Sequence, residues 1–336
     1  MVKVVAEMSG NHNGSLERAF QIADAAAKAD CWALKLQTYT ADSITIDSNR
    51  DEFIINDSKS LWNGSRLYDL YKKASTPYEW HEKIFAKCRE LGIVCFSTPF
   101  DVNAVDFLED LNCPIYKIAS FENSDWQLLR KIANTKKPVI MSLGMLPLEE
   151  IYESVDLLFK SGCPDLTLLK CTSTYPADPS ACNLLTIPDL KKRFPKCKIG
   201  LSDHTLGIGV AIASVALGAE VIEKHFTLSR KDLGVDSQFS MDKDEMAMLV
   251  REVEITSKAL GKVSYDLTEE EKESTKFRRS LYVVADIKAG EVFTEKNIRS
   301  IRPFFGVPAK FIDQVIGKKA KRDISSGTPL KMEDVA

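Results

Sequence analysis

Two of the four histidines in this 336-residue chain, His204 and His225, each follow an apolar run of strand length. Imidazole nitrogens, completed by carboxylate or water oxygens, suit Mn²⁺, and also Mg²⁺ or another divalent ion. We therefore predict that these two histidines hold a catalytic divalent metal. An alternative stays open from the residues alone, in which both are structural histidines hydrogen-bonded to Asp203 or Glu223.

Polar or charged residues close all eight apolar runs of strand length in the first part of the chain. They are Glu7, Lys35 with Gln37, Ser97 with Thr98, Lys117, Ser142, Lys170 with Thr172, Ser202 to Thr205, and Glu223 to His225. Burying an unpaired charge is expensive, so these residues need partners or ligands. Lysines with hydroxyls and loop amides can hold phosphate and carboxylate groups. The candidates for this role are Lys35, Lys117, Ser97, Thr98, Ser120 and Ser202. Alternatively, the lysines form internal ion pairs with Glu7 and Glu122. The two interpretations are compatible, because such ion pairs can preorganise the lysines for binding an anion.

Short apolar runs alternate with helical segments from residue 2 to about residue 260. Strands are predicted at 2–6, 33–36, 94–96, 115–118, 139–141, 166–169, 199–201 and 221–222. Helices are predicted at 16–28, 78–91, 102–111, 126–133, 148–160, 187–194, 208–217 and 244–260, with Asp101 and Asp125 as N-caps. Continuous apolar strands indicate a parallel sheet covered by helices on both faces. Eight such units predict an α/β fold of the (β/α)8 TIM-barrel type, in which chemistry is carried at the C-terminal strand ends. An open doubly wound sheet is less favoured, because the turn Asn11-His-Asn-Gly14 is no dinucleotide fingerprint.

Two further segments interrupt or follow this pattern. Residues 38–76 form a long insertion containing Trp62, Tyr68 and Tyr71, which predicts an ordered cover. Asp286-Ile-Lys-Ala-Gly290 recurs as Asp323-Ile-Ser-Ser-Gly327, which predicts a small pseudo-symmetric β-rich domain. The predicted boundaries are 1–265 for the barrel, 266–279 for a charged linker and 280–336 for the small domain. The hydrophobic core of the small domain would be marginal by itself, so we expect this domain to dock on another surface.

The composition excludes several classes of protein. The net charge is -3, so the chain lacks the excess of positive charge that is typical of proteins that bind nucleic acid. No run of about 18 apolar residues indicates a membrane span, and the first residues lack a signal-peptide pattern. The eight cysteines contain no C-x-x-C pair, which predicts buried reduced thiols. The cytoplasm is the compartment these features indicate.

Six motifs along the chain resemble the sialic acid synthase family. They are Ala6-Glu-Met-Ser-Gly-Asn-His-Asn-Gly14, Lys35-Leu-Gln-Thr38, Ser97-Thr-Pro-Phe100, Tyr116-Lys-Ile-Ala-Ser120, Ser202-Asp-His-Thr205 and Glu223-Lys-His-Phe226. The tail resembles the antifreeze-like SAF domain of that family, a β-clip fold. The resemblance covers nearly the whole chain.

This resemblance implies a transferase that condenses phosphoenolpyruvate with an amino sugar, giving a nine-carbon 2-keto acid and phosphate. It assigns the metal to His204 and His225. It assigns phosphoenolpyruvate to Lys35, Thr98, Lys117, Ser120 and Ser202, with Ser173 assisting. It assigns the sugar to Glu7, Gln37, Tyr175 and Asp236, and proton transfer or water positioning to Glu122. It also implies that Arg302 of the tail domain caps the barrel of the other subunit in a domain-swapped homodimer.

Within the family, the chain is most similar to the pseudaminic acid synthases. The signs are Glu7-Met-Ser-Gly10, Leu67-Tyr-Asp-Leu-Tyr71, Thr76-Pro-Tyr-Glu-Trp-His81 and Gly234-Val-Asp-Ser237, and Ser173 where sialic acid synthases commonly have asparagine. The implied sugar is 2,4-diacetamido-2,4,6-trideoxy-L-altrose. The alternatives are an N-acetylneuraminate or legionaminate synthase that uses another hexosamine. A metal-dependent isomerase or aldolase would not explain the lysines and hydroxyl residues at the strand ends. A non-catalytic carbohydrate-binding protein would not need them. His12 is a weaker site candidate, and His81 is expected to pack a helix.

Overall fold

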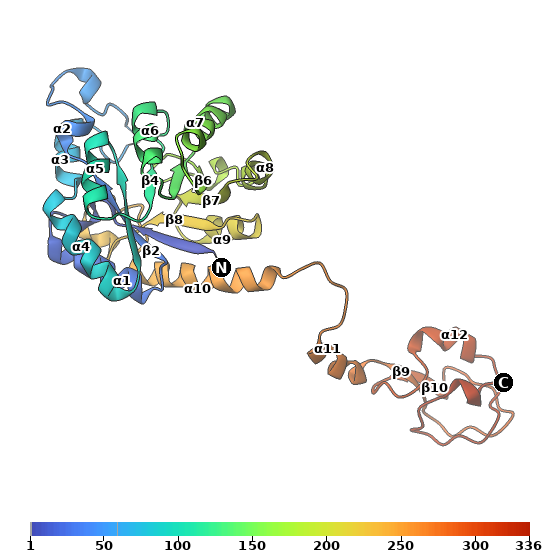
Figure 1. Ribbon diagram of the computed structural model, residues 1–336. Coiled ribbons are helices and arrows are strands. Elements are labelled where there is room, and N and C mark those ends of the chain that lie inside the picture. Colours follow the sequence, from blue (N-terminus) through green and yellow to red (C-terminus); the bar gives the residue numbers. More distant parts are fainter. Residues whose placement is uncertain (1, 59) are drawn as a thin grey trace. The chain divides into compact units, whose positions relative to one another are not determined.

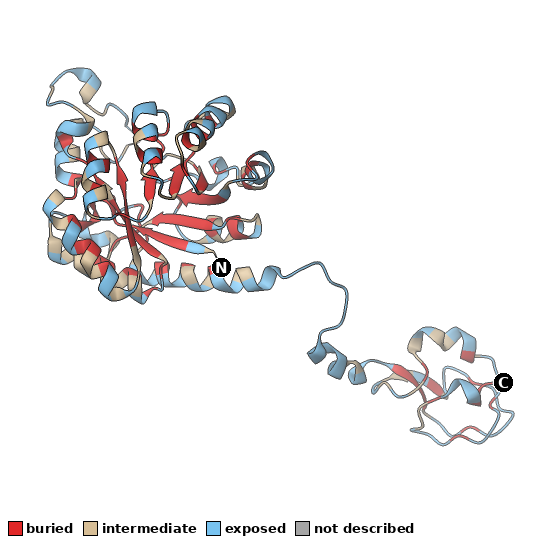
Figure 2. Ribbon diagram, in the orientation of Figure 1, coloured by how far each residue is buried: buried red, intermediate tan, exposed pale blue. Residues whose placement is uncertain are grey.

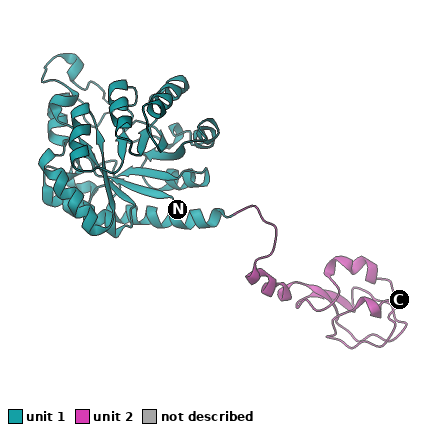
Figure 3. Cartoon of the chain, in the orientation of Figure 1, with its two compact units in different colours: residues 1–261 teal, residues 262–336 magenta. Residues whose placement is uncertain are grey.

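The chain divides into two units in this computed structural model, which describes residues 2–58 and 60–336. Unit 1 is Met1–Gly261 and unit 2 is Lys262–Ala336 (Figure 3). Each unit has its own cluster of buried apolar side chains. They are therefore described separately.

Unit 1 is a closed barrel of eight parallel strands surrounded by helices (Figure 1). The strands are β1 Lys3–Glu7, β2 Ala33–Thr38, β3 Val94–Pro99, β4 Tyr116–Ile118, β5 Val139–Ser142, β6 Leu166–Cys171, β7 Lys198–Asp203 and β8 Val221–His225. The barrel closes where β1 pairs with β8, in a register that runs from Lys3 opposite Val221 to Glu7 opposite His225. The predicted (β/α)8 barrel is confirmed.

Most of the strands extend beyond their predicted C-terminal ends. The apolar pattern ends β2, β7 and β8 at residues 36, 201 and 222, but these strands continue to Thr38, Asp203 and His225. An apolar run ends at the first polar residue, whereas the backbone pairing continues past it. The polar residues therefore lie inside the barrel strands, and every second side chain faces the barrel interior.

Eight helices follow the eight strands on the outside of the barrel. They are α1 Leu16–Lys28, α4 Tyr78–Leu91, α5 Val102–Asp110, α6 Trp126–Asn134, α7 Leu148–Lys160, α8 Thr186–Arg193, α9 Gly209–Ala216 and α10 Lys243–Leu260. The predicted caps are confirmed, because Asp101 and Asp125 each accept two backbone N–H bonds at the start of a helix. Figure 2 shows buried strands inside helices whose outer faces are exposed. No helix among the described residues has the length and apolar character needed to cross a membrane.

The insertion after β2 contains three short elements, α2 Ala41–Ile44, the 3-10 turn η2 Asp51–Phe53 and α3 Leu67–Ala74. A bridge pairs Ile54 with Arg66 at the base of a loop. Trp62 Nε1 donates to the carbonyl of Val235, in the connection after β8, at 3.1 Å. Trp62 thus attaches the insertion to another connection at the C-terminal end of the barrel. The remaining 3-10 turns of unit 1 are η1 Ser9–His12, η3 Pro179–Ala181 and η4 Arg230–Asp232.

Unit 2 contains an antiparallel pair, β9 Ser280–Val283 with β10 Ile298–Ile301. Its helical elements are α11 Glu269–Ser274, η5 Thr275–Phe277, η6 Ala309–Phe311, α12 Ile312–Val315 and η7 Met332–Asp334. The two predicted repeats lie against each other, because Ile287 and Ile324 exchange both backbone hydrogen bonds, at 2.9 and 2.8 Å. Asp286 and Asp323 each accept an amide hydrogen bond from the other repeat, at 2.8 and 2.9 Å. The pseudo-symmetric arrangement is confirmed.

Candidate active site

Two lysines and two glutamates form a buried ion-pair cluster inside the C-terminal end of the barrel. Lys35 Nζ lies 2.5 Å from Glu7 Oε2 and 3.6 Å from Glu223 Oε1. Lys117 Nζ lies 3.8 Å from the same Glu223 oxygen. All four side chains are almost inaccessible to solvent. We call Glu7, Lys35, Lys117 and Glu223 the lysine–carboxylate cluster.

Burial and charge act in opposite directions on the two glutamates of the cluster. Burial raises the pKa of Glu7 to about 7, although the Lys35 ammonium opposes the shift. Burial also disfavours the ionised form of Glu223, but the ammonium groups of Lys117 and Lys35 outweigh it and lower the Glu223 pKa. Glu223 is therefore the fixed negative charge between the lysines, while Glu7 can gain or lose a proton near neutral pH.

Hydroxyl groups complete the surroundings of both lysines. Lys35 donates to Thr98 Oγ1 at 3.1 Å. Lys117 donates to Ser142 Oγ at 2.8 Å and to its neighbouring carbonyl at 3.1 Å. Strand pairing places Ser202 directly beside Glu223, so Ser202 also faces the interior. Lys35 pairs with Glu7, as the alternative interpretation expected, and Lys117 forms its ion pair with Glu223.

Three successive connections meet beside this cluster at Gly144. A Cβ atom at Gly144 would lie 2.1 Å from Ser173 Oγ and 2.6 Å from Ser120 Oγ, so a larger residue would displace both serine hydroxyls. Ser120 Oγ is buried without a hydrogen-bond partner. Asn123 Nδ2 donates to the Gly144 carbonyl at 2.9 Å and so holds the connection in place. Two hydroxyls that converge on one glycine make a small cradle for an anion.

The two predicted metal ligands lie side by side at the ends of β7 and β8. Their ring centroids are 5.4 Å apart. His204 Nδ1 lies 3.0 Å from the Thr172 carbonyl, which leaves Nε2 available, and His225 Nδ1 is buried with no hydrogen-bond partner. Burial and the nearby His204 and lysine charges lower the His225 pKa, which favours the neutral, ligand form.

Neither carboxylate offered by the structural alternative contacts these histidines. Asp203 instead accepts from Lys224 Nζ at 2.8 Å, and Glu223 belongs to the lysine–carboxylate cluster. Two imidazoles that share one ion have ring centres about 5 Å apart, since a metal–nitrogen bond is about 2 Å long. The measured separation fits that geometry. Within residues 2–58 and 60–336, no three His, Cys, Asp or Glu groups gather around one point.

Glu122 lies in the turn after β4. Burial raises its pKa to about 7, with the Lys117 ammonium acting against the shift. Its Oε2 atom is buried and has no hydrogen-bond partner. A carboxyl group that titrates near pH 7 and has a free oxygen is suited to general acid–base catalysis.

Comparison with known proteins agrees with this arrangement. Residues 22–265 match the NeuB family and residues 278–336 match the SAF domain. The chain belongs to the NeuB family. It is 46% identical to a pseudaminic acid synthase of Campylobacter jejuni, over 99% of this chain and 96% of that protein. It is 35% identical to an N,N'-diacetyllegionaminic acid synthase of the same species, over 95% of this chain and 96% of that protein. The crystal structure of an N-acetylneuraminic acid synthetase from Leptospira borgpetersenii superposes with a TM-score of 0.72 and 32% identity, covering 81% of this chain and 90% of that one.

The residues that the resemblance assigns to the sugar lie at the same end of this NeuB-family barrel as the histidines. Gln37 Nε2 donates to Glu7 Oε1 at 2.9 Å and so orients that carboxylate. Tyr175 packs against His204, with ring centroids 4.4 Å apart. Asp236 Oδ2 accepts from Ser9 Oγ at 2.5 Å. The residues assigned to the sugar and those assigned to phosphoenolpyruvate thus lie at the same end of the barrel.

Three sequence candidates lie elsewhere or serve the scaffold. His12 accepts from the Gly14 amide at 3.1 Å, and its ring edge packs against Trp80. His81 is buried and bonds Thr38 Oγ1 at 2.9 Å, which agrees with the predicted packing role. Arg302 is an exposed residue of unit 2 that follows β10, and its contribution to the site stays a prediction.

Four further residues of the site were not assigned a role from the sequence. The sequence marks Ser142 only as a polar strand end and Glu223 only as a strand end or a possible partner of the histidines, and Gly144 gives no signal. The Cys171 thiol lies 3.5 Å from Ser173 Oγ and 3.9 Å from His204 Nδ1. Burial opposes its ionisation, but the contacts with His204 outweigh burial and lower the Cys171 pKa to about 6. The cysteine pattern of the sequence predicts an ordinary buried thiol at this position.

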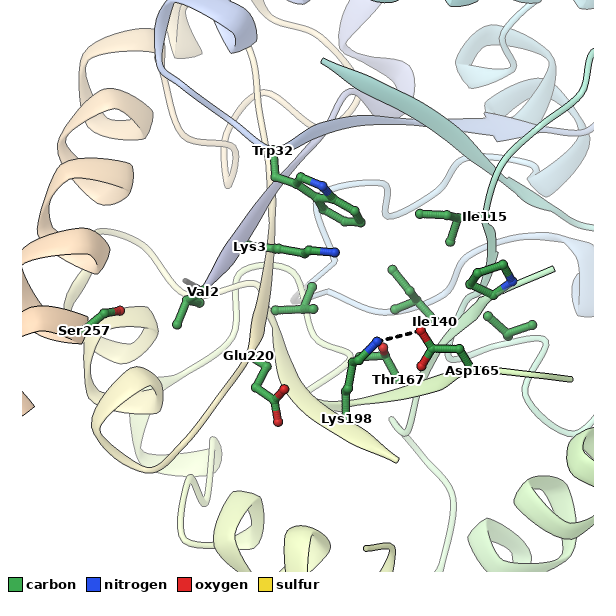
Figure 4. Close-up of a pocket in the computed structure, with 13 residues that line it drawn as sticks. Val2, Lys3, Trp32, Ile115, Ile140, Asp165, Thr167, Lys198, Glu220 and Ser257 are labelled. Carbon is green, nitrogen blue, oxygen red and sulfur yellow. Dashed lines mark hydrogen bonds and ion pairs between the residues drawn. The ribbon is translucent and has the colours of Figure 1, made fainter. Parts of the chain in front are cut away.

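A separate cavity of about 350 Å³ lies at the opposite end of the barrel (Figure 4). Its lining comes mainly from the N-terminal ends of the strands, with Ser257 from α10, and contains none of the predicted site residues. Lys198 is paired with Asp165 at 2.6 Å, and the Lys3 ammonium lies 4.1 Å from the centre of the Trp32 ring. The candidate active site is therefore the polar C-terminal end, as barrel architecture requires.

Proposed function

We propose that this NeuB-family chain is a pseudaminic acid synthase. It would condense phosphoenolpyruvate with 2,4-diacetamido-2,4,6-trideoxy-L-altrose to give a nine-carbon 2-keto sugar acid and phosphate. The observation that carries this proposal is a buried two-lysine anion site directly beside a pair of histidines, within one barrel end. The 46% identity to a pseudaminic acid synthase, against 35% to a legionaminic acid synthase, supports this sugar over the legionaminate alternative.

Phosphoenolpyruvate would bind across the lysine–carboxylate cluster and the serine cradle. Lys35 and Lys117 supply the positive charge, and Thr98 is already bonded to Lys35. The remaining proposed donors are Ser120, Ser173 and Ser202. Because the ammonium groups are held by Glu7 and Glu223 before any ligand arrives, little reorganisation is needed on binding.

His204 and His225 would hold the divalent ion, either Mn²⁺ or Mg²⁺. The free His204 Nε2, the unpartnered His225 Nδ1 and the 5.4 Å ring separation fit this role. A divalent ion bound there supplies Lewis-acid polarisation of an aldehyde oxygen. The remaining coordination positions would be filled by water and by substrate oxygens, because the described residues offer no group of three possible ligands.

The side chains around the ion and the anion site would carry out the condensation. C3 of phosphoenolpyruvate attacks the aldehyde carbon, and the new hydroxyl takes a proton. Water then adds to C2, and phosphate leaves by cleavage of its C–O bond, which gives the 2-keto group. Glu122 would transfer the proton or position the water, while Glu7, Gln37, Tyr175 and Asp236 orient the sugar. Holding both substrates in one geometry contributes much of the rate enhancement.

We also propose that the active form is a domain-swapped homodimer in the cytoplasm. Five large apolar side chains are more than half exposed on the connections that follow the strands, namely Phe121, Met145, Leu185, Leu206 and Leu233. Exposed apolar residues grouped in this way favour a covering partner. Unit 2 of the partner, with Arg302, would provide that cover. All eight cysteines are free, which fits a reducing compartment.

Phosphate release tests the proposal directly. The chain is incubated with phosphoenolpyruvate and Mn²⁺, and with either the altrose-derived sugar or N-acetylmannosamine. We expect release with the first sugar and far less with the second. Lys117→Met should remove the activity, whereas Lys198→Met, at the other end of the barrel, should retain it. No release with any hexosamine would exclude the synthase function, and preferential use of N-acetylmannosamine would correct the sugar.

A further inference from the structure

Three aromatic side chains form a continuous wall beside the two site histidines. Tyr175 lies 4.4 Å from His204, and Phe239 lies 4.9 Å from His225, as distances between ring centroids. Trp62 lies 6.1 Å from Tyr175 and 6.2 Å from Phe239. The wall therefore begins in contact with the histidines and extends outward to a residue of the insertion. We call Trp62, Tyr175 and Phe239 the aromatic wall.

The wall is fixed in position before any sugar binds. The one polar group of the indole is already used, because Trp62 Nε1 donates to the Val235 carbonyl. The connection that carries Val235 and Phe239 is held through buried bonds, with Ser240 Oγ donating to the Asp236 carbonyl at 2.7 Å. Trp62 thus contributes an apolar ring to the wall and no free hydrogen-bond donor. Such a surface favours a methyl group and disfavours a hydroxyl.

The geometry of the proposed substrate decides which methyl group meets the wall. In the proposed function the aldehyde lies at the histidines, so the substituent on the next carbon must lie close beside them. In an acylamino sugar that substituent is a planar amide, which ends in a methyl group. The far end of the sugar chain is separated from the aldehyde by several rotatable bonds, so the histidines do not fix its position.

We propose that the aromatic wall is the subsite for the methyl group of the acylamino substituent at C2 of the sugar, with Trp62 as a specificity-determining residue. This inference rests on the proposed function. Trp62 belongs to the insertion after β2, so the insertion contributes to substrate choice as well as covering the site. The other methyl group of the sugar, at C6, is the competing occupant.

The test combines substrate and protein changes in one cycle. The value of kcat/KM is measured for the C2 N-acetyl sugar and for its N-formyl analogue, with wild type and with Trp62→Ala. We expect wild type to prefer the acetyl sugar about tenfold, because a hydrophobic contact with one methyl group gives discrimination of that order. In Trp62→Ala the preference should fall to within about twofold, while KM for phosphoenolpyruvate is unchanged. Trp62→Phe keeps a ring and should retain an intermediate preference.

Trp126→Ala is the matched control, because Trp126 is an exposed residue at the start of α6 and its ring contacts Arg130. It should keep the full preference. A wild-type preference that is unchanged in both Trp62 variants would overturn the inference and leave the proposed function intact. Loss of discrimination between 6-deoxy and 6-hydroxy sugars instead would assign the wall to C6 and also overturn it. No turnover by wild type with either sugar would overturn the proposed function and this inference together.

Discussion

Glu223 is the residue whose replacement tests the site most directly. One of its oxygens lies 3.6 Å from Lys35 Nζ and 3.8 Å from Lys117 Nζ, and all three side chains are buried. Glu223→Gln keeps the size of the side chain but removes the negative charge that lies within 4 Å of Lys117. We expect this variant to fold with reduced stability.

The size of the effect follows from the burial of the cluster. Removing one partner of a buried ion pair costs about 3–5 kcal/mol, because an uncompensated charge remains. The glutamine amide oxygen can still accept a hydrogen bond, so we expect a loss of about 3 kcal/mol. For a barrel of this size that loss corresponds to a fall in Tm of roughly 6–12 °C.

Urea unfolding followed by tryptophan fluorescence measures this loss in unit 1 alone. All four tryptophans, at positions 32, 62, 80 and 126, belong to that unit. Glu220→Gln is the control, because Glu220 pairs with Lys191 at 3.3 Å at the exposed N-terminal end of the same strand. Its change should stay below about 0.5 kcal/mol. Phosphoenolpyruvate should also raise the Tm of Glu223→Gln more than that of wild type, because it replaces the lost negative charge. Equal stability of the two variants would refute the buried bridging role of Glu223.

Three other substitutions test separate parts of the site. Glu122→Gln should lower kcat about a hundredfold. It should also remove the dependence of kcat on pH near 7, because the pKa of the Glu122 carboxyl is about 7. A pH dependence that persists in the variant would point to Glu7, which has a similar pKa. Gly144→Ala should raise KM for phosphoenolpyruvate at least tenfold, because the added Cβ would lie 2.1 Å from Ser173 Oγ. Gly209→Ala is the control: a Cβ at Gly209 would have no neighbour within 4 Å, so this variant should match wild type in steady-state kinetics. His225→Ala should abolish Mn²⁺ binding measured by titration calorimetry while the circular dichroism spectrum is retained, and unchanged Mn²⁺ affinity would remove His225 from the metal site.

Strand alternation explains why some charged strand-end residues belong to the site and others do not. Lys224 lies between Glu223 and His225, yet it faces outward and pairs with Asp203 at 2.8 Å. Glu223 and His225 face inward because side chains along a strand point alternately to opposite faces. The sequence alone shows three consecutive polar residues at this strand end. Their direction becomes certain only once the register with β1 is known.

The sequence by itself determined the eight βα units, the polar end of the barrel, the two histidines and the tail domain. These features follow from local patterns: apolar runs, helix caps and motif spacing. Closure of the barrel decided the rest, because it places β8 beside β1 and so lets Glu223 face Lys35 across the interior. The contact of Trp62 with Tyr175 and Phe239 was likewise decided by tertiary structure. Contacts between residues more than a hundred positions apart depend on how the helices and strands pack, and no local pattern specifies that packing.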